Sequence, residues 1–189
     1  MKTSATRFSD SVEEYIKYRP GYPQQVIEIL KEEIDLNPRS IIADIGSGTG
    51  ISSALFVNNG NKVLAVEPNR EMREAAELIY LNNSNFTSIN GTAQQTSLPQ
   101  HSIDIIFCAQ AFHWFNTTET KIEFSRILQP NGDMVFVWNV RKDENDFQKD
   151  YETILRHIPE YNKVTHKNIS DEDISDFFAP KRIHKKNSC

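Results

Sequence analysis

The sequence has only two cysteines, no apolar run long enough to cross a bilayer, and no excess of positive charge. Cys108 and Cys189 form no CxxC or zinc-ligand pattern, which excludes a disulfide framework and fits a reducing cytoplasm. The N-terminal residues 1–7 lack the apolar core of a signal peptide, and the short apolar runs exclude a membrane-spanning helix. We therefore expect a cytoplasmic protein with no membrane partner.

The charge balance bears on nucleic acid as a partner. The chain of 189 residues carries 21 basic and 26 acidic residues, for a net charge of −5. Neutralising phosphates requires a basic face, so we expect no nucleic-acid partner. The sequence also shows no cluster with metal-ligand spacing and no nucleophile elbow, so we expect no metal site and no covalent catalysis.

Apolar strand patterns and helical stripes alternate through the middle of the chain. The predicted strands cover residues 40–45, 62–66, 86–89, 103–108 and 134–140, and the helices between them include 51–57, 72–79 and 122–128. This alternation predicts an α/β, Rossmann-like, doubly wound and mostly parallel sheet with helices on both faces. Ligands bind beyond the carboxyl ends of such strands, where Asp44, Glu67 and Gln110 lie.

The two ends of the chain read differently from the middle. Helical stripes cover residues 26–34, 147–158 and 171–178, and a basic segment ends the chain. We predict a single domain over residues 1–189. Its parts are an N-terminal helical lid (1–38), a cofactor-binding core (39–140), and a helical cap with a basic tail (141–189).

The segment from Ala43 to Gly50 combines a strand end with three alternating glycines. Gly46 allows a sharp turn, Gly48 allows the backbone to approach a ligand, and Gly50 allows close packing of the next helix. Glu67 ends the next strand and has two carboxylate oxygens that can accept ribose hydroxyls. The pattern predicts a site for a nucleoside-like cofactor.

The charges around this loop distinguish between cofactors. Dinucleotide sites favour G-x-G-x-x-G, whereas this loop reads G-x-G-x-G with Asp44 two places ahead. A carboxylate there repels a pyrophosphate but attracts a sulfonium or an amino group. S-adenosylmethionine has both cationic groups and no phosphate, so the pattern favours it over NAD.

On these motifs the sequence resembles the class I S-adenosylmethionine-dependent methyltransferases, nearest to the methyltransferase type 11 and trans-aconitate methyltransferase branch. The resemblance runs from about residue 8 to 140 and includes Val66–Asn69, Gly91–Gln94 with Leu98–Pro99, Ala109–Phe115 and Leu128–Gly132. Thr92 stands where many relatives have Asp, which puts a side-chain contact to the adenine amino group in doubt.

The resemblance implies a set of cofactor-binding residues. They are Tyr18, Arg19, Asp44, Gly46, Ser47, Gly48, Glu67, Pro68, Ala93, Gln94, Ala109 and Gln110. Together with Tyr22, Tyr18 is expected either to close over the cofactor or to staple the first helix to the sheet. Arg19 is alternatively an anchor for an anionic substrate or a surface arginine.

The substrate-binding candidates are His113, Trp114, Trp138 and Arg141. His113 is the one catalytic candidate, as a base or hydrogen-bond donor, and the alternative is that His113 and Trp114 pack their loop onto the domain. Trp138 is placed at the pocket rim or in the core, and Arg141 anchors a carboxylate or lies on the surface. Methyl transfer from a sulfonium chiefly requires alignment and exclusion of water.

The resemblance weakens after Val140, where the sequence predicts no convincing sixth and seventh strands. We therefore expect the C-terminal strands to be truncated and an edge of the sheet to be open. The favoured function is methyl transfer to a small molecule, such as a carboxylate. The alternatives are a catalytically impaired cofactor-binding protein, a methyltransferase of a protein or RNA target, and a nicotinamide-dependent oxidoreductase. The sequence leaves the oligomeric state unspecified.

Overall fold

The computed structural model describes residues 21–139, 144–159, 161 and 170–178. Contacts divide the chain into two compact units, Met1–Val137 and Trp138–Cys189, and each unit is described by itself. No helix within the described ranges has both the length and the apolar character needed to cross a membrane. The limits of the lid, core and cap remain predictions.

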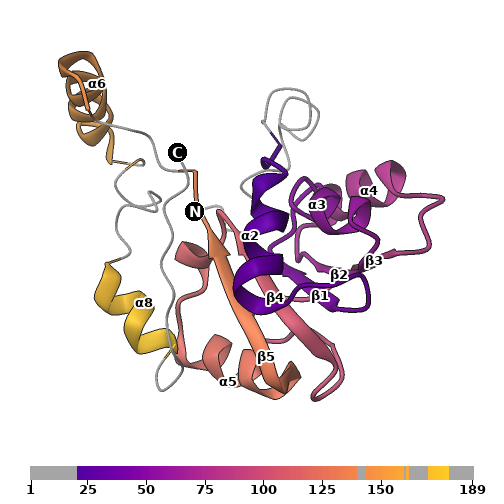
Figure 1. Cartoon of the computed structure of the whole chain (residues 1–189). Coiled ribbons are helices and arrows are strands. Elements are labelled where there is room, and N and C mark those ends of the chain that lie inside the picture. Colours follow the sequence, from indigo (N-terminus) through magenta and orange to yellow (C-terminus); the bar gives the residue numbers. More distant parts are fainter. Residues whose placement is uncertain (1–20, 140–143, 160, 162–169, 179–189) are drawn as a thin grey trace. The chain divides into compact units, whose positions relative to one another are not determined.

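The first unit is built on one sheet of five parallel strands, in the spatial order β3-β2-β1-β4-β5 (Figure 1). The strands are β1 (Ile41–Ile45), β2 (Lys62–Val66), β3 (Phe86–Ile89), β4 (Ile103–Ala109) and β5 (Leu128–Val137). The order reverses between β1 and β4, which is where open α/β sheets bind ligands. The predicted fold class is confirmed.

Helices α2 and α3 cover one face of this sheet. The helices of the first unit are α2 (Gln25–Ile34), α3 (Ser53–Asn58), α4 (Arg70–Ile79) and α5 (Thr118–Ile127), with a short 3-10 turn η3 (Phe112–Trp114). Ile27 of α2 and Phe56 of α3 share one buried cluster with the strand residue Phe107. The rings of Phe56 and Phe107 meet edge to face, with centroids 4.8 Å apart.

A series of aromatic rings connects α5 to the face of the sheet opposite α2 and α3. Phe136 pairs in register with Cys108, which points away from Phe107 because side chains alternate along a strand. The ring of Phe112 stacks on Phe136 at 4.3 Å, and Phe115 lies 6.2 Å from Phe124 of α5. The sheet is therefore covered on both faces. Cys108 is fully buried, as its apolar surroundings in the sequence predict.

Side-chain caps fix where α4 and α5 begin. The Asn69 side chain accepts a hydrogen bond from the Met72 amide at 2.9 Å, and the Thr117 hydroxyl accepts one from the Thr120 amide at 3.3 Å. Such caps satisfy amides that have no partner within the helix. The cap at Asn69 starts α4 two residues after Glu67, so the strand end and the helix start form one compact turn.

The predicted bounds of the fifth strand, residues 134–140, are wrong at both ends, because the strand ends at Val137 and starts before residue 134. β5 begins at Leu128, which pairs with Ile103, and an irregularity then shifts the register so that Asp133 pairs with Ile105. A Cβ at Gly132 would lie 2.7 Å from the Asp104 carbonyl oxygen, so only glycine allows the strands to approach this closely. The Pro-Asn-Gly segment at residues 130–132, which follows the predicted helix 122–128, therefore forms the irregular start of the strand.

The second unit contains α6 (Asp146–Arg156) and α8 (Asp171–Phe178), both of which the helical stripes predicted. A capping box starts α6. The Asn145 side chain accepts from the Gln148 amide at 2.9 Å, and the Gln148 side chain accepts from the Asn145 amide at 3.3 Å. The residues of this unit that the structure describes include no strand.

Candidate functional site

The glycine loop lies at the carboxyl ends of β1 and β2. The amides of Gly46 and Ser47 donate to the Val66 carbonyl at 2.9 and 3.3 Å, so the loop is tied to the end of the neighbouring strand. Gly46, Gly48 and Gly50 have φ values of +72°, +57° and +83°. These left-handed conformations favour glycine because they cost little without a Cβ. The loop and the end of β2 form the frame of the site.

The three glycines face different surroundings. A Cβ at Gly46 would lie 2.8 Å from the Ala111 Cβ, so the loop after β4 packs directly on this turn. A Cβ at Gly50 would lie 2.7 Å from the Tyr80 ring, whose hydroxyl donates to the Gly50 carbonyl at 2.8 Å. A Cβ at Gly48 would meet nothing within 4 Å. Gly48 is thus the glycine that leaves the backbone open to a ligand.

Glu67 reaches back from the end of β2 to the glycine loop. One of its carboxylate oxygens accepts the Gly48 amide at 3.0 Å, and the other accepts the Asn69 amide at 2.9 Å. Burial raises the pKa of Glu67, and the two backbone amides and the charge of Arg73 partly offset that rise. Each oxygen keeps a further acceptor position, because a carboxylate has about four lone-pair sites.

Arg73 on α4 holds the backbone that carries Glu67, and sequence reasoning did not identify it. Its guanidinium donates to the carbonyls of Glu67 and Pro68, both at 2.9 Å. Because both acceptors are backbone atoms, this clamp remains when the Glu67 side chain is changed. Arg73 is the fourth residue of α4, and because its acceptors are backbone atoms the sequence carries no signal for this contact.

Asp44 lies beneath the loop and is fully buried. Its Oδ2 accepts from the hydroxyls of Ser52 and Ser53 at 2.7 and 2.6 Å, and its Oδ1 has no partner among the described residues. Burial raises the pKa of Asp44 to about 6, although the two serine hydrogen bonds oppose the shift. The carboxylate therefore ties the loop to the start of α3 and keeps one oxygen unsatisfied.

This burial predicts an unusual pH dependence. The folded state holds the Asp44 proton up to about pH 6, whereas the unfolded chain loses it near the ordinary value of 3.8. The folded state thus binds more protons between these values, and the contribution of Asp44 to the free energy of unfolding falls as the pH rises. At pH 7 we expect Asp44→Asn to be more stable than the wild type by on the order of 2–3 kcal/mol.

Denaturant unfolding of both proteins from pH 4 to pH 7 measures this difference. The gap should be small at pH 4, grow up to about pH 6 and then stay constant, since Asn does not titrate. Parallel pH profiles for the two proteins would contradict the assignment.

A tight turn follows β3 on the same edge of the sheet. The Glu67 amide donates to the Ile89 carbonyl at 3.1 Å, so the end of β3 lies beside Glu67. Two backbone hydrogen bonds between Thr92 and Gln95, at 3.0 and 3.1 Å, close the turn. Ala93 is buried and Gln94 is exposed. The structure thus brings these two candidates to the edge that carries Glu67.

The last residue of β4, Ala109, and the loop after it carry the candidates from Ala109 to Trp114. Gln110 has a φ of +54°, and its amide donates to the Val137 carbonyl at 2.8 Å, which holds the strained residue in place. His113 and Trp114 are half-buried, with their rings 4.8 Å apart. Ala111 and Phe115 of this loop lie against Gly46, so the loop borders the glycine turn.

Four candidates are not brought into this frame. Tyr18, Arg19 and Arg141 lie outside the described residues. Trp138 directly follows β5 and is half-buried, but it belongs to the second unit. Their roles remain predictions. Within the described residues, no three His, Cys, Asp or Glu side chains are grouped as metal ligands.

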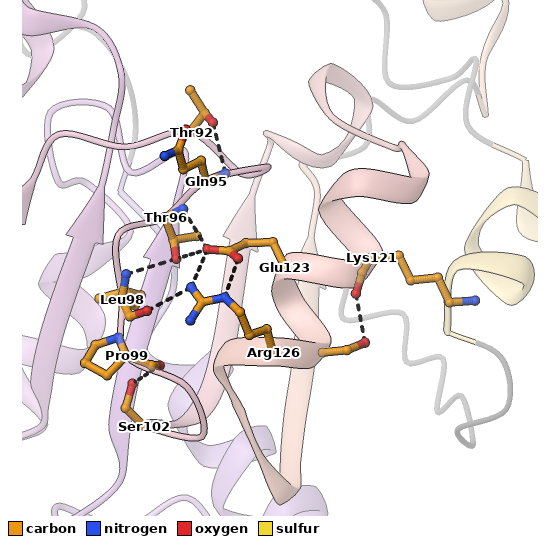
Figure 2. Close-up of polar contacts among 10 residues, drawn as sticks. Thr92, Gln95, Thr96, Leu98, Pro99, Ser102, Lys121, Glu123 and Arg126 are labelled. Carbon is orange, nitrogen blue, oxygen red and sulfur yellow. Dashed lines mark hydrogen bonds and ion pairs between the residues drawn. The ribbon is translucent and has the colours of Figure 1, made fainter.

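A network on α5 also reaches the segment after β3, and sequence reasoning missed it. The Glu123 carboxylate accepts from Thr96 and from Arg126, and Arg126 also donates to the Leu98 carbonyl at 2.8 Å (Figure 2). The spacing of Glu123 and Arg126 indicates a helical ion pair. The sequence has no local signal for the contact with Thr96, because the two residues are 27 positions apart.

Comparisons with known proteins agree with this geometry. A family model described as a methyltransferase domain matches residues 43–136. An uncharacterized methyltransferase from Schizosaccharomyces pombe is 31% identical over 135 residues, which is 71% of this chain and 53% of the relative. An uncharacterized methyltransferase from Mycobacterium tuberculosis is 32% identical over 136 residues, 72% of this chain and 53% of the relative. The chain spans about half the length of these curated relatives.

Among solved structures, a protein from Methanococcus maripaludis gives a TM-score of 0.69. That protein is named as a candidate S-adenosyl-L-methionine-dependent methyltransferase. The two sequences are 21% identical, and the match covers 94% of this chain and 84% of that one. At this identity the likeness supports the fold alone.

Proposed function

Since the chain belongs to the class I S-adenosylmethionine-dependent methyltransferases, we propose that it transfers a methyl group to a small-molecule acceptor, such as a carboxylate. The family uses S-adenosylmethionine as its methyl donor. The observation that carries the proposal for this chain is the contact between Glu67 and the glycine loop. An anionic side chain there accepts the Gly48 amide at 3.0 Å.

The residues at the loop suit a cofactor that has ribose hydroxyls and cationic groups but no phosphate. The space beside Gly48 is open, and Glu67 keeps acceptor positions for hydroxyl donors. The Gly48 amide would be needed to hold a pyrophosphate, but it already donates to a carboxylate, whose charge repels phosphate. The unsatisfied buried oxygen of Asp44 adds negative potential that favours a cationic ligand.

In this proposal Glu67 holds the ribose, and the backbone of the glycine loop contacts the rest of the cofactor. When bound, S-adenosylmethionine supplies an electrophilic methyl group on a sulfonium. The chain then has to orient an acceptor and exclude water. An acceptor that is already ionised, such as a carboxylate, needs no base. We place the protein in the cytoplasm as part of the same proposal.

Calorimetric titration of the full chain tests the proposal. We expect S-adenosylmethionine and S-adenosylhomocysteine to bind and NADH to give no signal. Binding of NADH without either sulfur compound would instead support the nicotinamide reading. Absence of binding by all three ligands would support a protein that has lost its cofactor site.

The role of His113 is tested separately from cofactor binding. If His113 is a base or a hydrogen-bond donor to the acceptor, His113→Ala should lower turnover by about tenfold or more, because general acid–base groups contribute at least that much. S-adenosylhomocysteine should bind the variant as tightly as it binds the wild type. Turnover is measured with whichever acceptor a screen identifies, and only an acceptor that must lose a proton, such as an amine or a phenol, tests the role as a base. Unchanged turnover would leave His113 as a residue that packs its loop.

A further inference from the structure

The strongest feature outside the cofactor frame is an ion pair on α5 between the buried Glu123 and the partly exposed Arg126. Glu123 is 8% exposed, and its Oε1 accepts from the Thr96 amide at 2.8 Å, the Thr96 hydroxyl at 2.6 Å and the Arg126 Nη2 at 2.8 Å (Figure 2). Its Oε2 accepts from the Arg126 Nε at 2.7 Å. A buried carboxylate with four donors holds its partners in one geometry, because each charge-assisted bond is short and directional.

The ion pair contacts backbone atoms of residues 96–98 as well as side chains. Arg126 donates to the Leu98 carbonyl at 2.8 Å, and the Thr96 hydroxyl accepts the Leu98 amide at 3.2 Å. Ser97 between them has a φ of +63°, which is unfavourable for a residue with a Cβ. A strained residue persists where its surroundings determine its conformation, and here the contacts on both sides come from Glu123 and Arg126.

The ion pair between Glu123 and Arg126 stays charged near neutral pH. The hydrogen bond from Arg126, helped by those from Thr96 and by the charge of Arg126, holds the pKa of Glu123 at about 2. Arg126 is correspondingly held in its charged form, with its pKa raised by Glu123. Both partners of the ion pair are therefore charged near neutral pH.

Residues 96–98, which Glu123 and Arg126 hold, directly follow the turn of residues 91–95 after β3. A Cβ at Gly91 would lie 2.9 Å from the Thr96 carbonyl oxygen, so the start and the end of the turn pack backbone against backbone. The turn follows Ile89, whose carbonyl accepts the Glu67 amide at 3.1 Å. A displacement of Thr96 is thereby passed to the turn that carries Ala93 and Gln94, next to Glu67.

We propose that Glu123 and Arg126 are positioning residues of the cofactor site. They hold the turn of residues 91–95 at the place relative to Glu67 that the nucleoside end of the cofactor requires. This inference rests on the proposed function, in which Glu67 holds the ribose, and on the resemblance, which implies that Ala93 and Gln94 of this turn contact the cofactor. Neither residue contacts the cofactor in this account, and both act through Thr96 and Leu98.

The test combines ligand affinity with local hydrogen exchange in the full chain. Glu123→Gln keeps the shape of the side chain but removes its charge and the ion pair. We expect S-adenosylhomocysteine to bind this variant about tenfold or more weakly, a loss comparable to that seen when the supporting partner of a metal-ligating residue is removed. Amide exchange should become faster in residues 91–98 and stay unchanged in residues 46–50. Glu119→Gln is the matched control, because Glu119 lies exposed on the same helix.

Three results would overturn the inference. The first is an affinity of Glu123→Gln within about twofold of the wild type, since a role in fold stability alone lowers the melting temperature without changing the affinity of the folded protein. The second is equal acceleration of exchange in residues 46–50, and the third is the same loss of affinity in the Glu119→Gln control. If Glu123→Gln does not fold, Arg126→Lys is judged by the same criteria, because it keeps the charge but loses the planar fork.

Failure of the proposed function gives a different result from failure of this inference. A wild-type chain that does not bind S-adenosylhomocysteine contradicts the proposed function itself. A wild-type chain that binds it, together with a folded Glu123→Gln variant of equal affinity, contradicts only the positioning role.

Discussion

Glu67→Ala is expected to weaken the binding of S-adenosylmethionine by about 100-fold or more, because a hydrogen bond to a charged group contributes about 1.5–3 kcal/mol and this carboxylate has two oxygens to offer. The fold should survive, since Arg73 donates to the backbone carbonyls of Glu67 and Pro68 rather than to the side chain. Calorimetric titration measures the affinity, and the melting temperature without ligand confirms that the variant is folded.

Two further variants make this result specific. Glu67→Gln keeps the size of the side chain but has one acceptor oxygen, while its amide nitrogen faces a backbone N–H donor. Its affinity should fall between those of the wild type and Glu67→Ala. Glu74→Ala removes an acidic residue from the same region, but Glu74 is exposed and pairs with Arg70 on the helix surface. The affinity of Glu74→Ala for S-adenosylmethionine should equal that of the wild type. If Glu67→Ala also bound with wild-type affinity, Glu67 would be excluded from the cofactor site.

The positions of the five strands could be predicted because each is a short apolar run bounded by turn residues. The exception, the start of β5, depended on a tertiary contact, the close approach of Gly132 to Asp104 on the neighbouring strand. No local pattern reports such an approach, and the Pro-Asn-Gly sequence also suits a helix stop. The start of β5 was therefore predicted wrongly because the turn residues were interpreted without knowledge of the neighbouring strand.

The frame of the candidate site was predictable for a related reason. Parallel strands bring their carboxyl ends to one edge, so Glu67 and the glycine loop had to be neighbours once the strands were assigned. Two details were not predictable. Gly50 makes room for the ring of Tyr80, which lies 30 positions away, and the predicted reason was close packing of a helix on the sheet.

The second unpredicted detail is the set of residues that hold the site from outside. Arg73 and Glu123 each appear in the sequence as ordinary charged residues on amphipathic helices. Their distinguishing contacts are with backbone groups of Glu67, Pro68 and Thr96, which any sequence provides. Side chains that bind backbone have no partner of recognisable type in the sequence, so only the structure identifies them.

Gly48→Ala is expected to separate ligand binding from stability. Its φ of +57° makes a side chain unfavourable by roughly 1–2 kcal/mol, but a Cβ there meets no atom within 4 Å. The free energy of unfolding should therefore fall by no more than this backbone cost. The added methyl group occupies the open space beside the loop, where the proposed cofactor has to contact the backbone, so the affinity for S-adenosylhomocysteine should fall about tenfold or more.

Gly60→Ala supplies the matched comparison, because it isolates the cost of the backbone conformation. Gly60 has a φ of +88°, and a Cβ there would come no closer than 3.9 Å to another atom, at Pro38. It precedes β2 and so lies at the opposite end of that strand from Glu67. Both variants should lose similar stability in denaturant unfolding, while only Gly48→Ala loses affinity. If the two variants bound S-adenosylhomocysteine equally well, the space beside Gly48 would not be where the cofactor meets the loop.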